Sequence, residues 1–238
     1  SNDKIDSLDV NNDFGSYKIM RIKDNIKSSQ IHSHNDIKPR YKVKMIKNLL
    51  RDKKISNILD VGCGLGYTAN ELKQTFKDAS VTGIDISKDA VAYANEKFSQ
   101  CKFLYDAIDP SNDKQIFKFD LITAFEFYPF TRTNSFKDHV EYLNHLTKSI
   151  STEGTLVISQ LWDNPLSLSI NYEALQKHFS KLVFKDYDLP IRKIGILIPH
   201  RELSISISKI TRKILRFFLK KKIGKHKIII IKRKLDTN

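Results

Sequence analysis

The chain has 238 residues, of which 41 are Lys or Arg and 27 are Asp or Glu, so its formal net charge is +14. Its length suits one α/β domain with additions. Its two cysteines exclude a disulfide framework or a cysteine-rich zinc site, and its apolar runs are too short to cross a bilayer. The basic excess lies in residues 191–238, which hold 15 Lys or Arg and 2 Asp or Glu. Such a block is either a solvated lysine-rich surface or a site for an anionic partner.

The first part of the chain, residues 1–36, is polar and predicts a loose arm with a short helix. Its first fourteen residues have no apolar signal-peptide core. The cysteine usage is typical of a reducing cytoplasm, and we expect a cytoplasmic protein, either free or peripheral to the inner face of the membrane. His32 and His34 could ligate a metal or contact an acceptor, but no partner ligands are evident nearby, and we predict no metal site. Residues 39–53 have apolar positions at helical spacing and predict a helix before the first strand.

A strand at about 57–61 runs into a loop that reads Asp-Val-Gly-Cys-Gly-Leu-Gly, and a helix is predicted after it at about 66–77. Glycines at this density indicate a close approach of the backbone to a ligand. A dinucleotide fingerprint would need a third glycine where the chain has Tyr67, and no Gly-Lys-Ser/Thr follows for a phosphate-binding P-loop. The loop therefore predicts a site for another cofactor.

This pattern, Asp-x-Gly-x-Gly-x-Gly, resembles motif I of the class I S-adenosylmethionine-dependent methyltransferases, and the resemblance extends over about residues 56–188. It implies S-adenosyl-L-methionine as the methyl donor and S-adenosyl-L-homocysteine as the product. The strand-end acid would hold the ligand's amino group, and the loop amides and helix N-terminus its carboxylate. That acid could instead only cap the glycine turn. The loop residues assigned to the cofactor are Asp60, Gly62, Cys63, Gly64 and Gly66.

The second strand, at about 81–85, also ends in an acid. Asp85 lies nineteen positions beyond Gly66, where a carboxylate can accept hydrogen bonds from both ribose hydroxyls. By the same resemblance, Ile86 would lie against the adenine face. Ser87 is the predicted N-cap of the following helix, which extends to about residue 98. Asp85 could alternatively serve that helix only as a capping acid.

The third strand, at about 102–107, ends in the same way. The resemblance gives the Asp106 side chain to the adenine amino group and the Ala107 amide to the ring, although the acid could be only a turn residue. The fourth strand, at 119–125, ends at Phe125, which the resemblance also assigns to the cofactor. Ligands of open α/β sheets lie beyond the carboxyl ends of the strands, so the segment that follows should border the transferable methyl group.

That segment, Glu-Phe-Tyr-Pro-Phe at 126–130, lacks the Asp/Asn-Pro-Pro-Tyr/Phe motif of exocyclic amino methyltransferases and the Pro-Cys nucleophile of pyrimidine carbon methylation. Direct transfer to oxygen or nitrogen remains, which needs alignment and removal of one acceptor proton. Glu126 is the first candidate base. His139 and His145, on a predicted helix at 136–150, are alternatives that could simply be packing residues. The side chains assigned to the acceptor are Tyr128, Arg132, Trp162 and His200.

The rest of the chain predicts a turn at Gly154, strands at 156–159, 182–187 and 226–234, and a helix at 172–179. The resemblance implies a Rossmann-like α/β fold with helices on both faces of a seven-stranded sheet, in the order 3-2-1-4-5-7-6 with strand 7 antiparallel. A stripe of Ile and Phe beside Lys and Arg predicts a basic amphipathic helix inserted between strands 6 and 7. We expect one domain in four parts: an arm and helix at 1–54, the cofactor-binding core at 55–189, the insertion at 190–224, and the last strand and tail at 225–238.

We predict methyl transfer to oxygen or nitrogen of a small or carrier-linked, anionic acceptor, such as a phosphorylated sugar or a nucleotide- or lipid-linked intermediate. RNA methylation is the alternative, because the basic tail has the electrostatic footprint for RNA. A non-catalytic cofactor-binding or membrane-associated regulator is a third hypothesis. The inserted helix could cover the acceptor pocket, mediate a dimer contact, or rest on an anionic membrane surface through residues 205–222. The sequence leaves the oligomeric state open.

Overall fold

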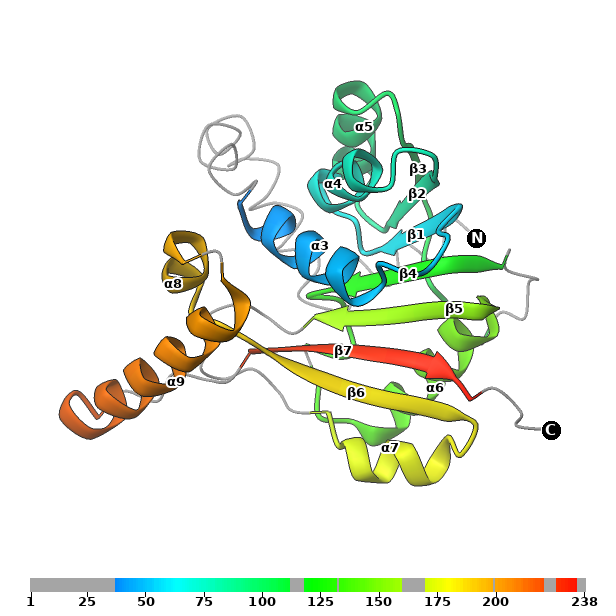
Figure 1. Cartoon of the computed structure of the whole chain (residues 1–238). Helices are drawn as coiled ribbons and strands as arrows, with labels where there is room; N and C mark the ends of the chain where they lie inside the picture. Colours follow the sequence, from blue (N-terminus) through cyan, green and yellow to red (C-terminus); the bar gives the residue numbers. More distant parts are fainter. Residues whose placement is uncertain are drawn as a thin grey trace. The chain divides into compact units, whose positions relative to one another are not determined.

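The computed structural model describes residues 37–111, 118–131, 133–159, 170–198, 200–220 and 226–234 (Figure 1). Seven strands form one sheet in the order β3-β2-β1-β4-β5-β7-β6, which confirms the predicted order. The chain divides into two compact units, Ser1–Ile108 and Asp109–Asn238. The predicted arm at 1–36, with His32 and His34, lies outside the described residues.

The described part of the first unit alternates helices and strands. Its elements are α3 (Ile37–Leu49), β1 (Asn57–Val61), α4 (Tyr67–Thr75), β2 (Ser80–Asp85), α5 (Lys88–Lys97) and β3 (Lys102–Tyr105). The three strands are parallel, and Val61 at the end of β1 pairs with Ile84 near the end of β2. The segments that follow these two strands therefore emerge at the same edge of the sheet.

Helix α3 is shorter than predicted at its C-terminal end. The sequence pattern extended to residue 53, whereas the helix ends at Leu49 and the Lys53 amide donates to the Leu50 carbonyl in a turn. Leu50 is buried, while Arg51 and Asp52 are exposed. A further helical turn would therefore gain little packing, and packing supplies most of the stability of such helices. Helix α3 packs against α4 in the same unit.

The second unit contains the other four strands. Its elements are β4 (Phe119–Phe125), α6 (Phe136–Lys148), β5 (Ile150–Ser159), α7 (Tyr172–His178), β6 (Leu182–Leu189), α8 (Arg192–Leu197), α9 (Arg201–Phe218) and β7 (His226–Arg233). Strand β7 is antiparallel to β5 and to β6, as predicted. Its four isoleucines, 228–231, are all buried although successive side chains point to opposite faces of the sheet. Both faces of β7 are therefore covered, which explains why the strand is a continuous apolar run.

Gly154 occupies a different place from the one predicted. The sequence put it in the turn before the fifth strand, but β5 begins at Ile150 and Gly154 lies inside it. The pairing of β4 with β5 shifts register between Phe119 and Leu121. A Cβ atom on Gly154 would lie 2.7 Å from the Phe119 carbonyl oxygen and 2.8 Å from the Ser151 nitrogen. The glycine thus allows the close backbone contact at this irregularity.

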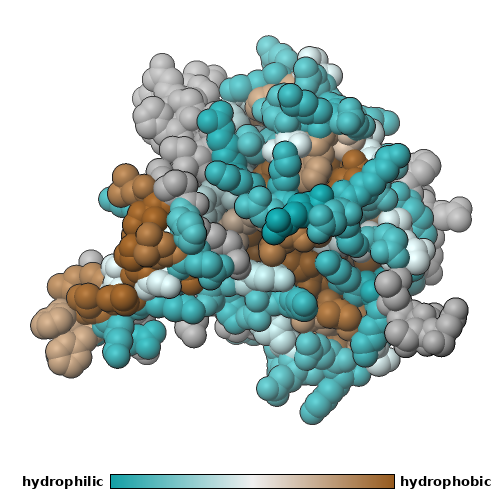
Figure 2. All heavy atoms as spheres, viewed as in Figure 1, coloured by the Kyte–Doolittle hydropathy of each residue, from teal (hydrophilic) through white to brown (hydrophobic). Residues whose placement is uncertain are grey.

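The predicted insertion between strands 6 and 7 consists of α8 and α9. Helix α9 has 18 residues and projects beyond the end of β6 at which α8 begins (Figure 1). Hydrophobic side chains gather on its exposed surface (Figure 2). Within the part of the chain that the structure describes, no helix is both long enough and apolar enough to cross a membrane.

Candidate functional site

The glycine loop after β1 adopts a backbone that most other residues avoid. Gly62, Gly64 and Gly66 have φ angles of 68°, 53° and 83°, in the left-handed region that favours glycine. The amides of Gly62 and Cys63 donate to the carbonyl oxygen of Ile84 at 2.8 and 3.1 Å. The loop is thereby held against the end of β2.

Asp85 joins this loop to the next helix. Its Oδ2 accepts a hydrogen bond from the Gly64 amide at 2.7 Å, and its Oδ1 accepts one from the Ser87 amide at 2.9 Å. Ser87 in turn caps α5, as predicted, because its hydroxyl oxygen accepts from the Ala90 amide at 3.3 Å. The Asp85 side chain is 8% exposed. A charged acceptor is therefore fixed beside the loop, where the sequence assigned it to the ribose hydroxyls.

Two further predicted residues, Asp60 and Cys63, are buried at the same loop. Burial raises the pKa of the Cys63 thiol, and the nearby carboxylates of Asp60 and Asp85 raise it further. The thiol therefore stays protonated at neutral pH and is a poor nucleophile. Cys63 thus contributes bulk to the loop and does not supply covalent chemistry.

Gly83 and Phe103 pack against the glycine loop. The sequence analysis assigned neither of them a role. A Cβ atom on Gly83 would lie 2.7 Å from Cδ1 of Phe103 and 2.8 Å from Sγ of Cys63. A Cβ atom on Gly66 would lie 2.8 Å from Cζ of Phe103. The Phe103 ring, from β3, therefore fills the space that these two glycines leave open. An isolated glycine inside a strand is the signal that could have found Gly83, because it often marks such close packing.

The predicted adenine contacts lie after β3. Asp106 is exposed, and its Oδ1 accepts a hydrogen bond from the Ala107 amide at 2.8 Å. The Asp106 amide donates to the Asp85 carbonyl oxygen at 3.2 Å, which brings the ends of β2 and β3 together. Ile86 is half-buried. Contact of the Ala107 amide with an adenine ring would require it to exchange its bond to Asp106.

In the second unit, Glu126 follows Phe125 directly after β4 and has a φ angle of 56°. Its amide donates to the Ser159 carbonyl oxygen at 2.8 Å, at the end of β5. A glutamate in the left-handed region stores strain of order 1–2 kcal/mol. Residues held in this way cluster at active sites, which favours Glu126 among the candidate bases.

Aromatic side chains of the segment after Glu126 pack against Tyr142 of α6. The rings of Tyr128 and Tyr142 make an edge contact with centroids 5.7 Å apart. The Tyr128 hydroxyl donates to Asp138 at 3.2 Å, and burial together with the Asp138 charge raises the pKa of Tyr128. Tyr128 is therefore a neutral hydrogen-bonding group at neutral pH. It is half-buried, so its assignment to the acceptor stays a prediction.

Both predicted histidines of α6 are buried. Nε2 of His139 lies 3.2 Å from the Pro129 carbonyl oxygen and 3.0 Å from that of Thr133. Carbonyl oxygens only accept hydrogen bonds, so Nε2 carries the proton. His139 is 2% exposed, and His145 is also buried. These positions favour packing roles for both residues and weaken their candidacy as bases.

The remaining acceptor candidates are dispersed or undescribed. His200 is the N-cap of α9, where its Nδ1 accepts from the Leu203 amide at 3.3 Å. Arg132 and Trp162 lie outside the described residues. Among the residues that the structure does describe, no group of three or more His, Cys, Asp or Glu side chains could hold a metal ion.

Comparison with known proteins gives a family match and several relatives. A family model described as a methyltransferase domain matches residues 52–213. The malonyl-[acyl-carrier protein] O-methyltransferase of Acetivibrio thermocellus is 29% identical over 122 residues, which are 51% of this chain and 41% of that protein. The ubiquinone biosynthesis O-methyltransferase of Rickettsia bellii is 31% identical over 140 residues, or 55% of this chain and 52% of that protein. The chain thus spans about half or less of the length of these relatives.

Solved structures share the fold over a larger part of the chain. The plantazolicin methyltransferase BpumL, in complex with SAH, superposes with a TM-score of 0.62 at 18% identity. The match covers 98% of each chain. The similarity therefore includes the α8–α9 insertion as well as the sheet.

Proposed function

The chain belongs to the methyltransferase-domain family whose model it matches over residues 52–213, and from this premise we propose that it transfers a methyl group from S-adenosylmethionine to oxygen or nitrogen of a small or carrier-linked acceptor. The observation that best supports binding of the methyl donor is the hydrogen bond from the Gly64 amide to the Asp85 carboxylate. It places a buried charged acceptor beside a loop whose three glycines have positive φ.

These residues fit the donor. The hydroxyl groups of a ribose need a fixed acceptor, which Asp85 supplies from the end of β2. The carboxylate of an amino acid needs N–H donors, which the glycine loop and the N-terminus of α4 supply. Because Gly66 immediately precedes α4 at its N-cap, the loop passes directly into that helix terminus. When bound, the sulfonium supplies an activated methyl group, so the chain needs only to hold and align it.

We assign the handling of the methyl acceptor to Glu126. Transfer to a hydroxyl or amine requires an aligned acceptor and a group that takes up one proton. Glu126 stands at the carboxyl end of β4, the strand end at which ligands of open α/β sheets bind. Its left-handed backbone conformation fixes the direction of its Cα–Cβ bond. We assign it to orienting the acceptor and removing its proton.

The names of the relatives support the acceptor class. The two relatives named above are O-methyltransferases, and one is named for malonyl-[acyl-carrier protein], a carrier-linked acceptor. The excess of Lys and Arg in residues 191–238 suits an anionic acceptor or carrier. The proposal therefore favours oxygen of an anionic or carrier-linked molecule.

The test is methyl transfer to a panel of hydroxy acids, phenols, amines and acyl-carrier thioesters. Release of S-adenosylhomocysteine reports turnover, and mass spectrometry reports an added methyl group on the acceptor. We expect transfer to at least one oxygen or nitrogen acceptor, and a large loss of turnover with unchanged donor affinity in Glu126→Gln. Tight donor binding without transfer to any member would support a non-catalytic role instead.

A further inference from the structure

Helix α9 buries one line of polar side chains, with Ile205 beside it, and leaves an apolar line exposed, unlike an ordinary surface helix. Ser204, Ser208 and Arg212, spaced four residues apart on one line of the helix, are all buried. Leu203, Ile210 and Phe217, on another line, are 51%, 60% and 78% exposed. Ile214 lies on the same line, and Phe218 and, just beyond the helix, Leu219 are exposed as well. Among the residues that the structure describes, none covers this apolar stripe.

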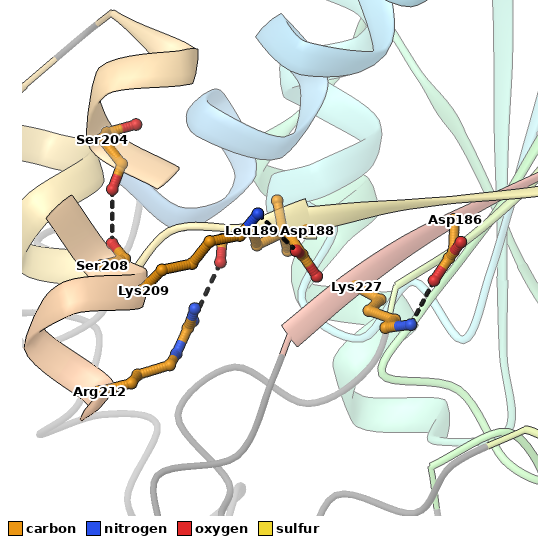
Figure 3. Close-up of polar contacts among 8 residues, drawn as sticks. All are labelled: Asp186, Asp188, Leu189, Ser204, Ser208, Lys209, Arg212 and Lys227. Atoms are coloured by element: carbon orange, nitrogen blue, oxygen red, sulfur yellow. Dashed lines mark hydrogen bonds and ion pairs between the residues drawn. The ribbon is translucent and has the colours of Figure 1, made fainter. Parts of the chain in front are cut away.

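Specific polar contacts fix this orientation (Figure 3). The Ser208 hydroxyl donates to the Ser204 carbonyl oxygen at 2.6 Å and accepts from the Ile191 amide at 2.8 Å. The Arg212 Nη2 donates to the Leu189 carbonyl oxygen at 3.0 Å. If α9 were rotated so that its apolar side faced inward, these contacts would be lost. The polar groups that they satisfy would then be left without those hydrogen bonds. The outward position of the apolar stripe is therefore built into the fold.

A basic stripe runs beside the apolar one. Lys209, Lys213 and Arg216 lie at helical spacing on the adjoining face, Lys220 follows just beyond the helix, and all four are exposed. Lys209 also reaches Asp188 at 3.7 Å, a surface ion pair of little energy. Adjacent apolar and basic stripes on one helix are typical of helices that lie in the plane of a membrane interface.

We propose that α9 docks on a lipid surface that carries anionic headgroups. Its apolar stripe would enter the boundary between headgroups and acyl chains, and its basic stripe would meet the lipid phosphates. A second copy of the chain fits less well, because a two-fold contact between antiparallel α9 helices would bring the two basic stripes to the same side. A nucleic acid would meet the basic stripe but leave Phe217 and Phe218, which are 78% and 73% exposed, in water. This inference does not depend on the proposed methyl transfer.

The first experiment is co-sedimentation of the whole chain with vesicles of phosphatidylcholine alone or mixed with phosphatidylglycerol. We expect binding to the mixed vesicles that weakens as salt is added, because exposed charges are screened. Replacing Phe217 and Phe218 together by Ser should weaken binding on the order of 100-fold. Phe136→Ser, which alters an exposed ring on α6, is the matched control and should bind like the parent chain.

The second experiment separates local charge from net charge. The double variant Lys213→Gln and Arg216→Gln should weaken partitioning by roughly 10- to 30-fold. The double variant Lys177→Gln and Lys181→Gln removes the same charge from exposed positions elsewhere and should change it little. If both double variants lost the same amount of vesicle binding, net charge alone would explain the binding. That result would overturn the assignment of the binding surface to α9.

Two other results would also overturn the proposal. One is the absence of binding by the parent chain to the mixed vesicles at low salt. The other is a dimer in sedimentation velocity that the Phe217 and Phe218 variant converts to a monomer, since the apolar stripe would then be a contact between copies. Circular dichroism and donor affinity, measured on every variant, confirm that the fold is retained.

Discussion

Replacement of Asp85 by Asn tests the two hydrogen bonds by which its carboxylate connects the glycine loop to the N-terminus of α5. The carboxylate accepts bonds of 2.7 and 2.9 Å from the amides of Gly64 and Ser87. Asparagine keeps one oxygen but turns a donor toward the second amide, which leaves a buried N–H unsatisfied. That defect costs about 1–3 kcal/mol, so the free energy of unfolding of the ligand-free chain should fall by about 2 kcal/mol.

The same change should weaken the cofactor complex. Hydrogen bonds to a charged acceptor contribute about 1.5–3 kcal/mol, which corresponds to a loss of affinity of about 10- to 150-fold. Titration calorimetry with S-adenosylhomocysteine measures this loss, and urea unfolding measures the stability. Asp89→Asn makes the same substitution at an exposed position in the first turn of α5 and should cost less than about 1 kcal/mol. Unchanged affinity in Asp85→Asn would refute the ribose assignment.

Three further predictions follow from the loop, the strained glutamate and the second cysteine. Gly83→Ala should lower the free energy of unfolding by about 1–3 kcal/mol in urea titrations, because its Cβ would lie 2.7 Å from Phe103; equal stability would contradict the packing. Glu126→Gly should be about 1 kcal/mol more stable than Glu126→Ala, since only glycine relieves the φ of 56°, and both should lose turnover at unchanged donor affinity. Burial raises the pKa of Cys101 to about 11, so the folded chain keeps a proton that the unfolded chain releases at lower pH. Stability should therefore fall as the pH rises toward 11, and Cys101→Ala should flatten that slope; an unchanged slope would argue against this assignment.

The resemblance to the methyltransferases implied the order of the sheet, and the structure confirms it. The glycine loop could be recognised from local pattern, and its assignment to the cofactor stays a prediction. Apolar runs that end in an acid mark the ends of β1 and β2, and the glycines mark the loop. Gly83 and Phe103 were missed because their role depends on a contact between β2, β3 and the loop. The isolated glycine inside β2 was the one local signal of this contact, and nothing in the sequence of β3 indicated the part of Phe103 in it.

Two other features also depend on tertiary structure. The left-handed backbone of Glu126 leaves no signal in the sequence, because glutamate seldom adopts it. The apolar stripe of α9 would ordinarily be read as the buried face of a helix. The structure instead buries the line that contains Ser208 and Arg212, because Arg212 bonds to the last residue of β6 and Ser208 to the segment that follows it.

Hydrogen exchange with and without S-adenosylhomocysteine tests the central claim most directly. If the glycine loop and Asp85 hold the cofactor, the ligand should slow amide exchange in residues 62–66, 85–87 and 106–107. Exchange in β6 and β7 should change little, because those strands are remote in sheet order. Unchanged exchange at the loop under saturating ligand, or protection confined to other segments, would contradict the assignment of the cofactor site.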